Sequence, residues 1–166
     1  EVAILAGVML SLVVYLARTS RPHMRTVLPD PAHPARKFTE YVPGMSECPQ
    51  AKFLRVEGSL YFGAIDHAAG HFDALRSHDP GQKHLVLMSK SMNFVDVAGA
   101  ELLAHEARRR RADGGGLYFY GMRQDARDAL ERFRRVARHD FHDPGEGVLL
   151  VAGVDPLGRV TDEEIL

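Results

Sequence analysis

Hydrophobic and polar positions divide the chain into one long apolar run and a series of shorter periodic segments. Residues 2–17 contain no charged side chain, and their hydrophobicity is nearly uniform around a helix, which distinguishes them from an amphipathic surface helix. Beyond residue 50, β-prone runs alternate with segments whose apolar residues recur at helical spacing. The pattern therefore predicts an apolar helix followed by an α/β domain.

The α/β part is predicted to alternate strand and helix. Strands are expected at residues 53–57 and 60–62 (separated at Gly58), 84–88 and 117–120, with helices at 64–77, 96–112 and 124–138. Residues 148–152 fit a last strand or the start of a helix, because periodicity alone cannot separate the two. This order implies a mostly parallel β-sheet with right-handed crossovers, with helices on one face or on both.

The apolar run of residues 2–17 resembles part of a membrane span. It would form about 24 Å of helix, roughly one turn less than the ~30 Å of a bilayer core. Five basic residues and one acid follow between residues 18 and 37, and such an excess of positive charge marks the cytoplasmic side of a membrane. We interpret residues 1–17 as the C-terminal part of the last transmembrane helix. The alternative is a buried helix of a soluble protein, for which the following Arg- and Pro-containing stretch offers no cover.

Six prolines lie between residues 22 and 49. Proline lacks an amide hydrogen and fixes φ, so we expect this stretch to be extended and irregular. The predicted organisation is therefore a juxtamembrane Pro-rich linker at residues 18–50 and a cytoplasmic domain at residues 51–166.

Composition narrows the classes of function. The chain has 166 residues, 45% of them apolar and 26% charged, which suits one compact domain with an appendage. A net charge of −1 argues against a dedicated nucleic-acid-binding protein. The single cysteine, Cys48, can form no internal disulfide and belongs to no CxxC zinc motif. The sequence predicts no cofactor and no metal.

Three segments, in this order, resemble the SulP family of anion transporters. Residues 4–22 resemble the end of the last membrane helix, and residues 53–72 resemble the opening of the cytoplasmic STAS domain. Residues 85–103 resemble the STAS signature, which is a buried strand, a short loop, Asp-x-Ser/Thr-Gly and a helix. Residues 114–122 extend the match, whereas the tail from His139 onward resembles the family poorly. The resemblance implies a STAS-like fold.

The same resemblance implies a function. A STAS domain in a bacterial SulP-type secondary transporter of sulfate, bicarbonate or dicarboxylate would act as a regulatory and interaction module on the cytoplasmic side of the inner membrane, without being an enzyme. Its implied partners are the transmembrane domain of the same transporter, a second copy in a homodimer, and acyl carrier protein or another acidic protein.

The signature loop, Asp96-Val97-Ala98-Gly99, has a structural role that needs no ligand. Asp96 precedes the expected helix, and its carboxylate is placed to accept the amides of Ala98 and Gly99 as an N-cap. The same helix N-terminus could attract an anion or a nucleotide. Because the chain contains no GxxxxGK[ST] loop, we expect nucleotide binding there to be weak.

The alternative hypothesis is a signalling protein that resembles the anti-sigma-factor antagonists. That group carries a phosphorylated serine immediately before the signature glycine, whereas this chain has Ala98, which has no hydroxyl to phosphorylate. Ser89 and Ser91, in the loop before the signature, are the remaining candidate phosphosites.

Two clusters have metal-ligand residue types. His67 and His71 stand four residues apart, but the sequence offers no third ligand, and a surface pair is the simpler interpretation. The second cluster lies near the end of the last helix and could bind a metal or sense pH, but a polar turn is the simpler interpretation. It consists of His139, Asp140, His142 and Asp143.

Charge is unevenly distributed along the second half of the chain. Arg108–Arg111 suit the C-terminal end of a helix, and the segment from residue 139 onward is acidic. We expect helix and tail to pair internally; the alternative is a basic face for anionic lipid or an acidic partner. Glu163 and Glu164 are expected in an exposed tail. No Ser/His/Asp or Cys/His motif supports a catalytic site, including that of a small nucleotide-hydrolysing enzyme.

Overall fold

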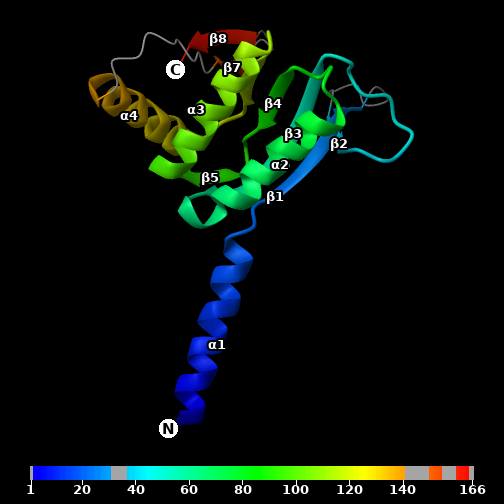
Figure 1. The fold of residues 1–166 in the computed structure, drawn as a ribbon. Coiled ribbons are helices and arrows are strands. Elements are labelled where there is room, and N and C mark those ends of the chain that lie inside the picture. Colours follow the sequence, from blue (N-terminus) through cyan, green and yellow to red (C-terminus); the bar gives the residue numbers. More distant parts are fainter. Residues whose placement is uncertain (1, 31–36, 141–149, 155–159, 165–166) are drawn as a thin grey trace.

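The computed structural model describes residues 2–30, 37–140, 150–154 and 160–164, with side chains for the described residues as far as residue 133, apart from 18 and 19. A single helix, α1 (Val2–Thr19), projects from one end of an α/β domain (Figure 1). The side chains of residues 2–17 are exposed along the whole helix. Among the described residues, no helix has the length and apolar character required to traverse a bilayer.

One mixed sheet forms the centre of the domain. Its strands follow the order β2-β1-β3-β4-β6-β7-β8, and β5 pairs separately with β3. The inner strands β3, β4, β6 and β7 are parallel, whereas β1, β2 and β8 are antiparallel to their neighbours. The strands are β1 (His23–Pro29), β2 (Phe38–Glu40), β3 (Ala51–Leu60), β4 (His84–Met88), β5 (Met92–Val95), β6 (Gly116–Tyr120), β7 (Leu150–Val154) and β8 (Val160–Glu164).

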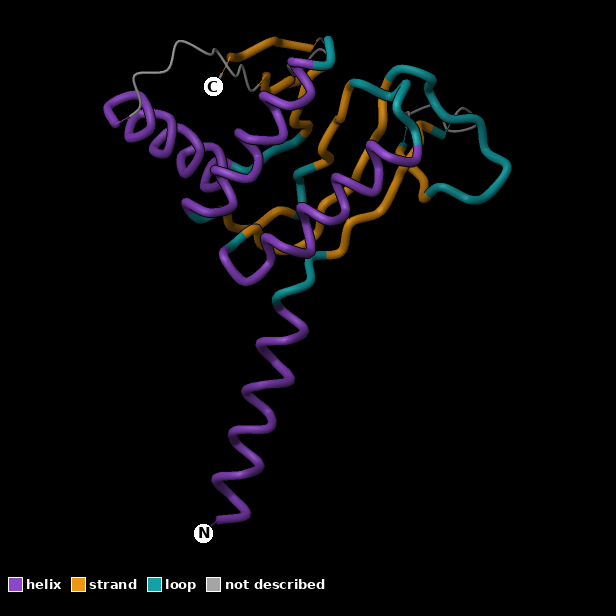
Figure 2. Tube along the Cα trace, in the orientation of Figure 1, coloured by secondary structure: helices purple, strands orange, loops and turns teal. Residues whose placement is uncertain are grey.

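Three helices pack on one face of this sheet (Figure 2). They are α2 (Ile65–His78), preceded by the short 3-10 turn η1 (Phe62–Ala64), α3 (Val97–Ala112) and α4 (Gln124–Asp140). The parallel strands are added in chain order in one direction, so crossovers of the same hand place every helix on the same side. This resolves the layer order that the sequence pattern left open.

The core lies between the helices and the sheet. Alternate residues of β3, β4 and β6 point toward the helices, and small helix residues allow close contact; the buried set includes Leu54, Val56, Leu85, Leu87, Leu117, Phe119, Ala68, Phe72, Ala100, Leu103, Ala126 and Leu130. The period of two in the strands and the period of 3.6 in the helices therefore meet in one hydrophobic layer.

Part of the stretch expected to be an irregular linker belongs to the sheet. Strand β1 pairs antiparallel with β3 from His23 opposite Glu57 to Thr26 opposite Leu54, and β2 pairs with β1. The expectation of irregular structure is wrong at these two strands, because Pro22 precedes β1 and Pro29 is its last residue, so neither interrupts the ladder to β3 at His23–Thr26. Met24, Val27 and Leu28 are buried, so β1 contributes to the core although its buried positions do not follow a strict alternation. The division of the chain at residue 51 stays a prediction.

Gly58 bends β3 and does not end it. Its φ of 114° lies in the left-handed region that favours glycine, and the register of the pairing shifts between Gly58 and Ser59. Beyond this bulge, the end of β3 pairs with β5, a strand that the sequence pattern did not predict. The break expected at Gly58 is thus a change of partner strand.

Two strands lie near the C-terminus. Residues 148–152 had two interpretations, and β7 supports the strand. Glu163 and Glu164, expected in a tail, instead lie within β8, which pairs antiparallel with β7. His142 and Asp143 lie outside the described residues, as do the side chains of His139 and Asp140.

The loop before β3 is tied to the domain by a largely buried ion pair. The Lys52 ammonium lies 2.6 Å from a Glu47 carboxylate oxygen, which also accepts a hydrogen bond from Gln82 at 3.2 Å. Burial raises the pKa of Glu47, but the hydrogen bonds from Lys52 and Gln82 and the Lys52 charge outweigh it, so the pKa lies below its usual value of 4.5.

Acid is therefore expected to release this contact. A carboxylate with a lowered folded-state pKa contributes stability that is complete above the unfolded-state pKa and is lost as the pH falls through the folded-state pKa. We expect the free energy of unfolding to decline as the pH falls below 4.5, and less steeply in Glu47→Gln. Urea unfolding across this pH range measures both slopes, and identical slopes would contradict the assignment.

Candidate functional site

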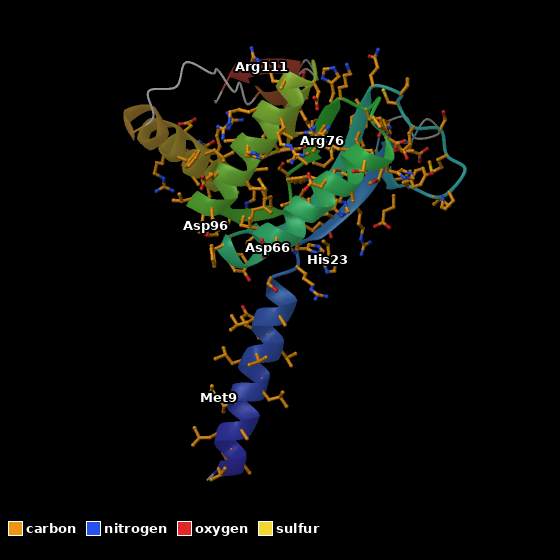
Figure 3. All side chains as sticks on the ribbon, in the orientation of Figure 1. Met9, His23, Asp66, Arg76, Asp96 and Arg111 are labelled. Carbon is orange, nitrogen blue, oxygen red and sulfur yellow. The ribbon has the colours of Figure 1, made fainter. Side chains whose placement is uncertain are left out.

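The signature loop lies at the edge of the sheet where β3, β4 and β6 end. The Ser89 amide donates to the Tyr120 carbonyl at 2.9 Å, and the Gly58 amide donates to the Ser91 carbonyl at 3.1 Å. In Figure 3, Asp96 lies at the same end of the domain as Asp66 and His23, which is the end from which α1 projects. Ligands of open α/β sheets bind outside the carboxyl ends of their strands, so a functional site is expected at this edge.

Asp96 makes two side-chain hydrogen bonds to separate elements. Its Oδ1 accepts the Gly99 amide at 2.8 Å, as an N-cap of α3, and its Oδ2 accepts the Phe62 amide at 2.9 Å. The cap to Gly99 confirms the predicted role. The second bond goes to Phe62 of η1 and not to Ala98. Asp96 therefore joins the start of α3 to the turn that leads into α2.

Gly99 allows α3 to approach β3. A Cβ atom at this position would lie 2.4 Å from the Leu60 carbonyl oxygen, and Leu60 accepts the Asp96 amide at 3.1 Å. Since backbone atoms cannot withdraw as a flexible side chain can, only glycine fits. The signature glycine is therefore explained by packing.

The three candidate phosphorylation positions differ in accessibility. Ser89 is fully buried, and its hydroxyl donates to the Leu87 carbonyl at 3.0 Å. Ser91 is exposed in the loop, and Ala98 offers no hydroxyl. A kinase could therefore reach Ser91 without unfolding the domain but could not reach Ser89. Modification of Ser91 stays a prediction.

Three large apolar side chains that belong to residues bonded to Asp96 or near it in the sequence are exposed to solvent. Phe62 is 82% exposed, Phe94 54% and Val97 70%. They come from η1, β5 and the first turn of α3, so the hydrogen bonds of Asp96 bring their elements together. The sequence pattern places these residues in local motifs and does not predict that they share an exposed surface. Local pattern could not reveal them, because Val95, which is also apolar and next to Asp96, is buried.

The hypothesis of an anion or nucleotide at this helix N-terminus has a competitor within the chain. The Asp96 carboxylate already accepts the Gly99 amide and places negative charge where an anion would be attracted. Binding would require this carboxylate to move or to share the position. Contact of Asp96, Val97, Ala98 and Gly99 with a ligand stays a prediction that the geometry does not favour.

His67 and His71 lie on one helix without a further candidate ligand nearby. Within the described residues, no group of three or more His, Cys, Asp or Glu side chains could hold a metal. His71 is half-buried, and this burial, together with the neighbouring His67 and Lys52, lowers its pKa. The pair is thus best explained as part of the α2 surface.

The run of four arginines is only partly available to a partner. Arg109 pairs with Asp73 of α2 at 2.8 Å, and Arg110 pairs with the buried Glu106 at 2.6 Å. Arg108 and Arg111 are exposed. Pairing of the run with the acidic tail involves side chains outside the described residues.

A cavity of about 320 Å³ lies at the opposite end of the domain from Asp96. It opens between the C-terminal ends of α2 and α3 and is lined by Arg76, Asp79, Pro80, Gln82, Lys83, Arg110 and Asp113. The carbonyl ends of two helices oppose an anion there, and Arg76 pairs with Asp113 at 2.7 Å. The lining is consistent with a hydrated surface hollow.

Removing the Asp96 side chain is expected to destabilise this edge. Asp96→Ala loses the cap and the bond to Phe62, with an expected loss of about 2 kcal/mol in the free energy of unfolding. Asp96→Ser retains a capping oxygen but is too short to bond to Phe62 as well, so about half of that loss is expected. Urea unfolding followed by circular dichroism, in a detergent that covers α1, separates the two roles. Equal losses in both variants would show that only one bond contributes.

The similar sequences and the similar folds both come from the STAS domain family or from anion transporters. Residues 43–136 match the STAS domain family. YvdB of Bacillus subtilis (strain 168), which is named for sulfate transport, is 23% identical over 100 residues, or 58% of this chain and 18% of that protein. The murine anion transporter Slc26a9, in an inward-facing state, aligns with a TM-score of 0.65 and 17% identity over 78% of this chain and 21% of its own. A further SLC26A9 structure gives 0.67 and 14%, over 82% and 24%. The chain thus spans about a fifth of each relative.

Proposed function

Because the chain belongs to the STAS domain family, we propose that it is the cytoplasmic regulatory and interaction domain of a SulP-type secondary anion transporter. The observation that carries this proposal is the STAS match over residues 43–136, placed after the exposed apolar helix α1. The named relatives are much longer than this chain, which suits a module within a larger transporter. Sulfate, bicarbonate and dicarboxylates are the anion classes proposed for the whole protein.

The proposed location is the cytoplasmic face of the inner membrane. The apolar side chains of α1 are exposed around the whole helix, and water is an unfavourable environment for so large an apolar surface. Arg18 and Arg21 follow directly, as expected on the cytoplasmic side. We place α1 in the apolar phase and the α/β domain beneath it.

In this role the domain acts by contact and not by chemistry. Asp96 and Gly99, the signature residues with the most constrained positions, are engaged in holding η1, β3 and α3 together. The first proposed partner is the transmembrane domain of the same transporter. A second copy and an acidic protein are further candidates, the latter meeting the exposed Arg108 and Arg111.

Transport by the intact protein tests the proposal. Deleting residues 51–166 from the whole transporter should reduce uptake of radiolabelled sulfate or bicarbonate, after correction for protein abundance in the membrane. The isolated chain, residues 1–166, should support no uptake in vesicles. Unchanged uptake after the deletion would exclude a regulatory role, and uptake by the isolated chain would exclude the assignment as an accessory domain.

A further inference from the structure

Phe62, which is hydrogen-bonded to Asp96, and Phe94 and Val97, which are within two residues of it in the sequence, form an exposed apolar cluster at one end of the domain. These residues are 82%, 54% and 70% exposed, although each is large enough to be buried in an ordinary soluble domain. Figure 3 shows Asp96 at the end of the domain from which α1 projects. Exposed apolar side chains that cluster commonly mark a contact surface.

The connection between α1 and the domain is too short to separate the two. The Ser20 amide donates to the Leu16 carbonyl at 3.0 Å, so the helical turn continues to this residue, and β1 begins at His23. The two residues between them span at most about 7 Å. Pro22, at the end of this connection, is buried. It lies close to Gly58, because a Cβ atom added to Gly58 would be 3.6 Å from the Cα atom of Pro22.

The ladder beyond Gly58 leads directly to the apolar cluster. Gly58 pairs with Met92, and Ser59 pairs with Phe94. Phe94 is therefore attached, through one strand pair, to the point where α1 meets the domain. A headgroup layer is only about 5–8 Å thick on each side of the bilayer core, so a domain held this closely has its near edge at the lipid surface.

Resting on the membrane location proposed above, we propose that Phe62, Phe94 and Val97 enter the lipid interface beside α1. Aromatic and aliphatic side chains at the tip of a rigid edge gain free energy by leaving water for the acyl boundary. Charge at this edge is mixed, because the basic residues Arg21 and Lys90 and the acidic residue Asp66 are all exposed. Apolar insertion, and not attraction to anionic headgroups, therefore drives the contact.

The consequence is a fixed orientation of the domain on the membrane. α1 supplies one attachment, and the cluster supplies a second on the other side of the bulge in β3. Two attachments remove the rotation of the domain about the short connection at Arg21 and Pro22. The end of the domain that holds the arginine run then points into the cytoplasm.

A fluorophore on single cysteines tests the contact in the full chain reconstituted into phosphatidylcholine vesicles. With Cys48→Ser as background, Val97→Cys and Ala112→Cys place the label at the first and last residues of α3, about 22 Å apart on one helix. Ser11→Cys places it within α1. We expect brominated lipid to quench the label at positions 11 and 97 but not at 112, with blue-shifted emission at 97.

Further variants and outcomes separate the explanations. Adding Phe62→Ser and Phe94→Ser to Val97→Cys should shift the emission at 97 back to that of water, while circular dichroism stays unchanged. Quenching at 11 but not at 97 would overturn the proposed insertion and leave the membrane location intact. Loss of quenching at 11 as well would overturn both. Protection of 97 from aqueous iodide without lipid quenching would indicate a protein partner and would also overturn the insertion.

Discussion

Replacing Glu106 with leucine is expected to lower the free energy of unfolding by about 3–5 kcal/mol. Glu106 is 1% exposed and Arg110 3% exposed, and their side chains meet at 2.6 Å between Oε1 and Nε. Burial lowers the pKa of Arg110, and the Glu106 charge opposes this shift. Without the Glu106 carboxylate, the Arg110 guanidinium would remain buried without a counter-charge, and an unpaired buried charge is strongly destabilising.

The arginine also supports the loop before β4. Its Nη1 donates to the carbonyls of Gln82 and Lys83 at 3.2 and 3.3 Å. Glu106→Leu combined with Arg110→Met removes both charges while keeping similar volume, and its loss should be smaller than that of Glu106→Leu alone. These values come from urea unfolding monitored by circular dichroism, since the chain contains no tryptophan.

The neighbouring arginine offers a matched control on the same helix. Arg109 pairs with Asp73 at the surface at 2.8 Å, and exposed ion pairs contribute only about 0–1 kcal/mol. Arg109→Met should therefore have a small effect. If Arg109→Met and Glu106→Leu cost the same, burial of the ion pair does not determine its importance.

Gly99→Ala is expected to cost about 3 kcal/mol in the free energy of unfolding. The added methyl group would lie 2.4 Å from the Leu60 carbonyl oxygen, so α3 must move away from β3. That movement also strains the hydrogen bond from the Asp96 amide to Leu60 and the cap from Asp96 to Gly99. Urea unfolding measures the loss.

Gly70→Ala provides the opposite expectation for the same chemical change. Gly70 lies in α2, is exposed, and has no atom within 4 Å of a built Cβ. Alanine is the better helix former, so the substitution should stabilise the domain by up to about 1 kcal/mol. If Gly99→Ala stabilised the domain as Gly70→Ala is expected to do, helix propensity, and not the contact with Leu60, would govern position 99.

Sequence periodicity predicted the parts of the fold that depend on local pattern. The helices beginning near residues 65, 97 and 124 and the strands at 84–88 and 117–120 were located within a residue or two, because each carries an apolar face of the correct period. Asp96 was identified as a cap from its position before an apolar helix. These features follow from neighbouring residues.

The missed elements depend on partners distant in the sequence. The buried residues of strand β1, Met24, Val27 and Leu28, show no regular alternation, and its pairing with β3 requires residues about thirty positions away. Strand β5 pairs with the end of β3 at and beyond Gly58, where the register shifts, so it depends on residues more than thirty positions away. The second bond of Asp96, to Phe62, likewise joins residues that no local motif connects.

The direct connection from α1 into β1 gives the domain a mechanical property. Strand β1 is held to the central strand β3 by a ladder of hydrogen bonds perpendicular to both. A force that pulls α1 along the axis of β1 loads all of these bonds together in shear, so no single bond can yield before the others. A displacement of α1 is therefore transmitted through β1 to the central strand β3, with little deformation of the short connection between α1 and β1.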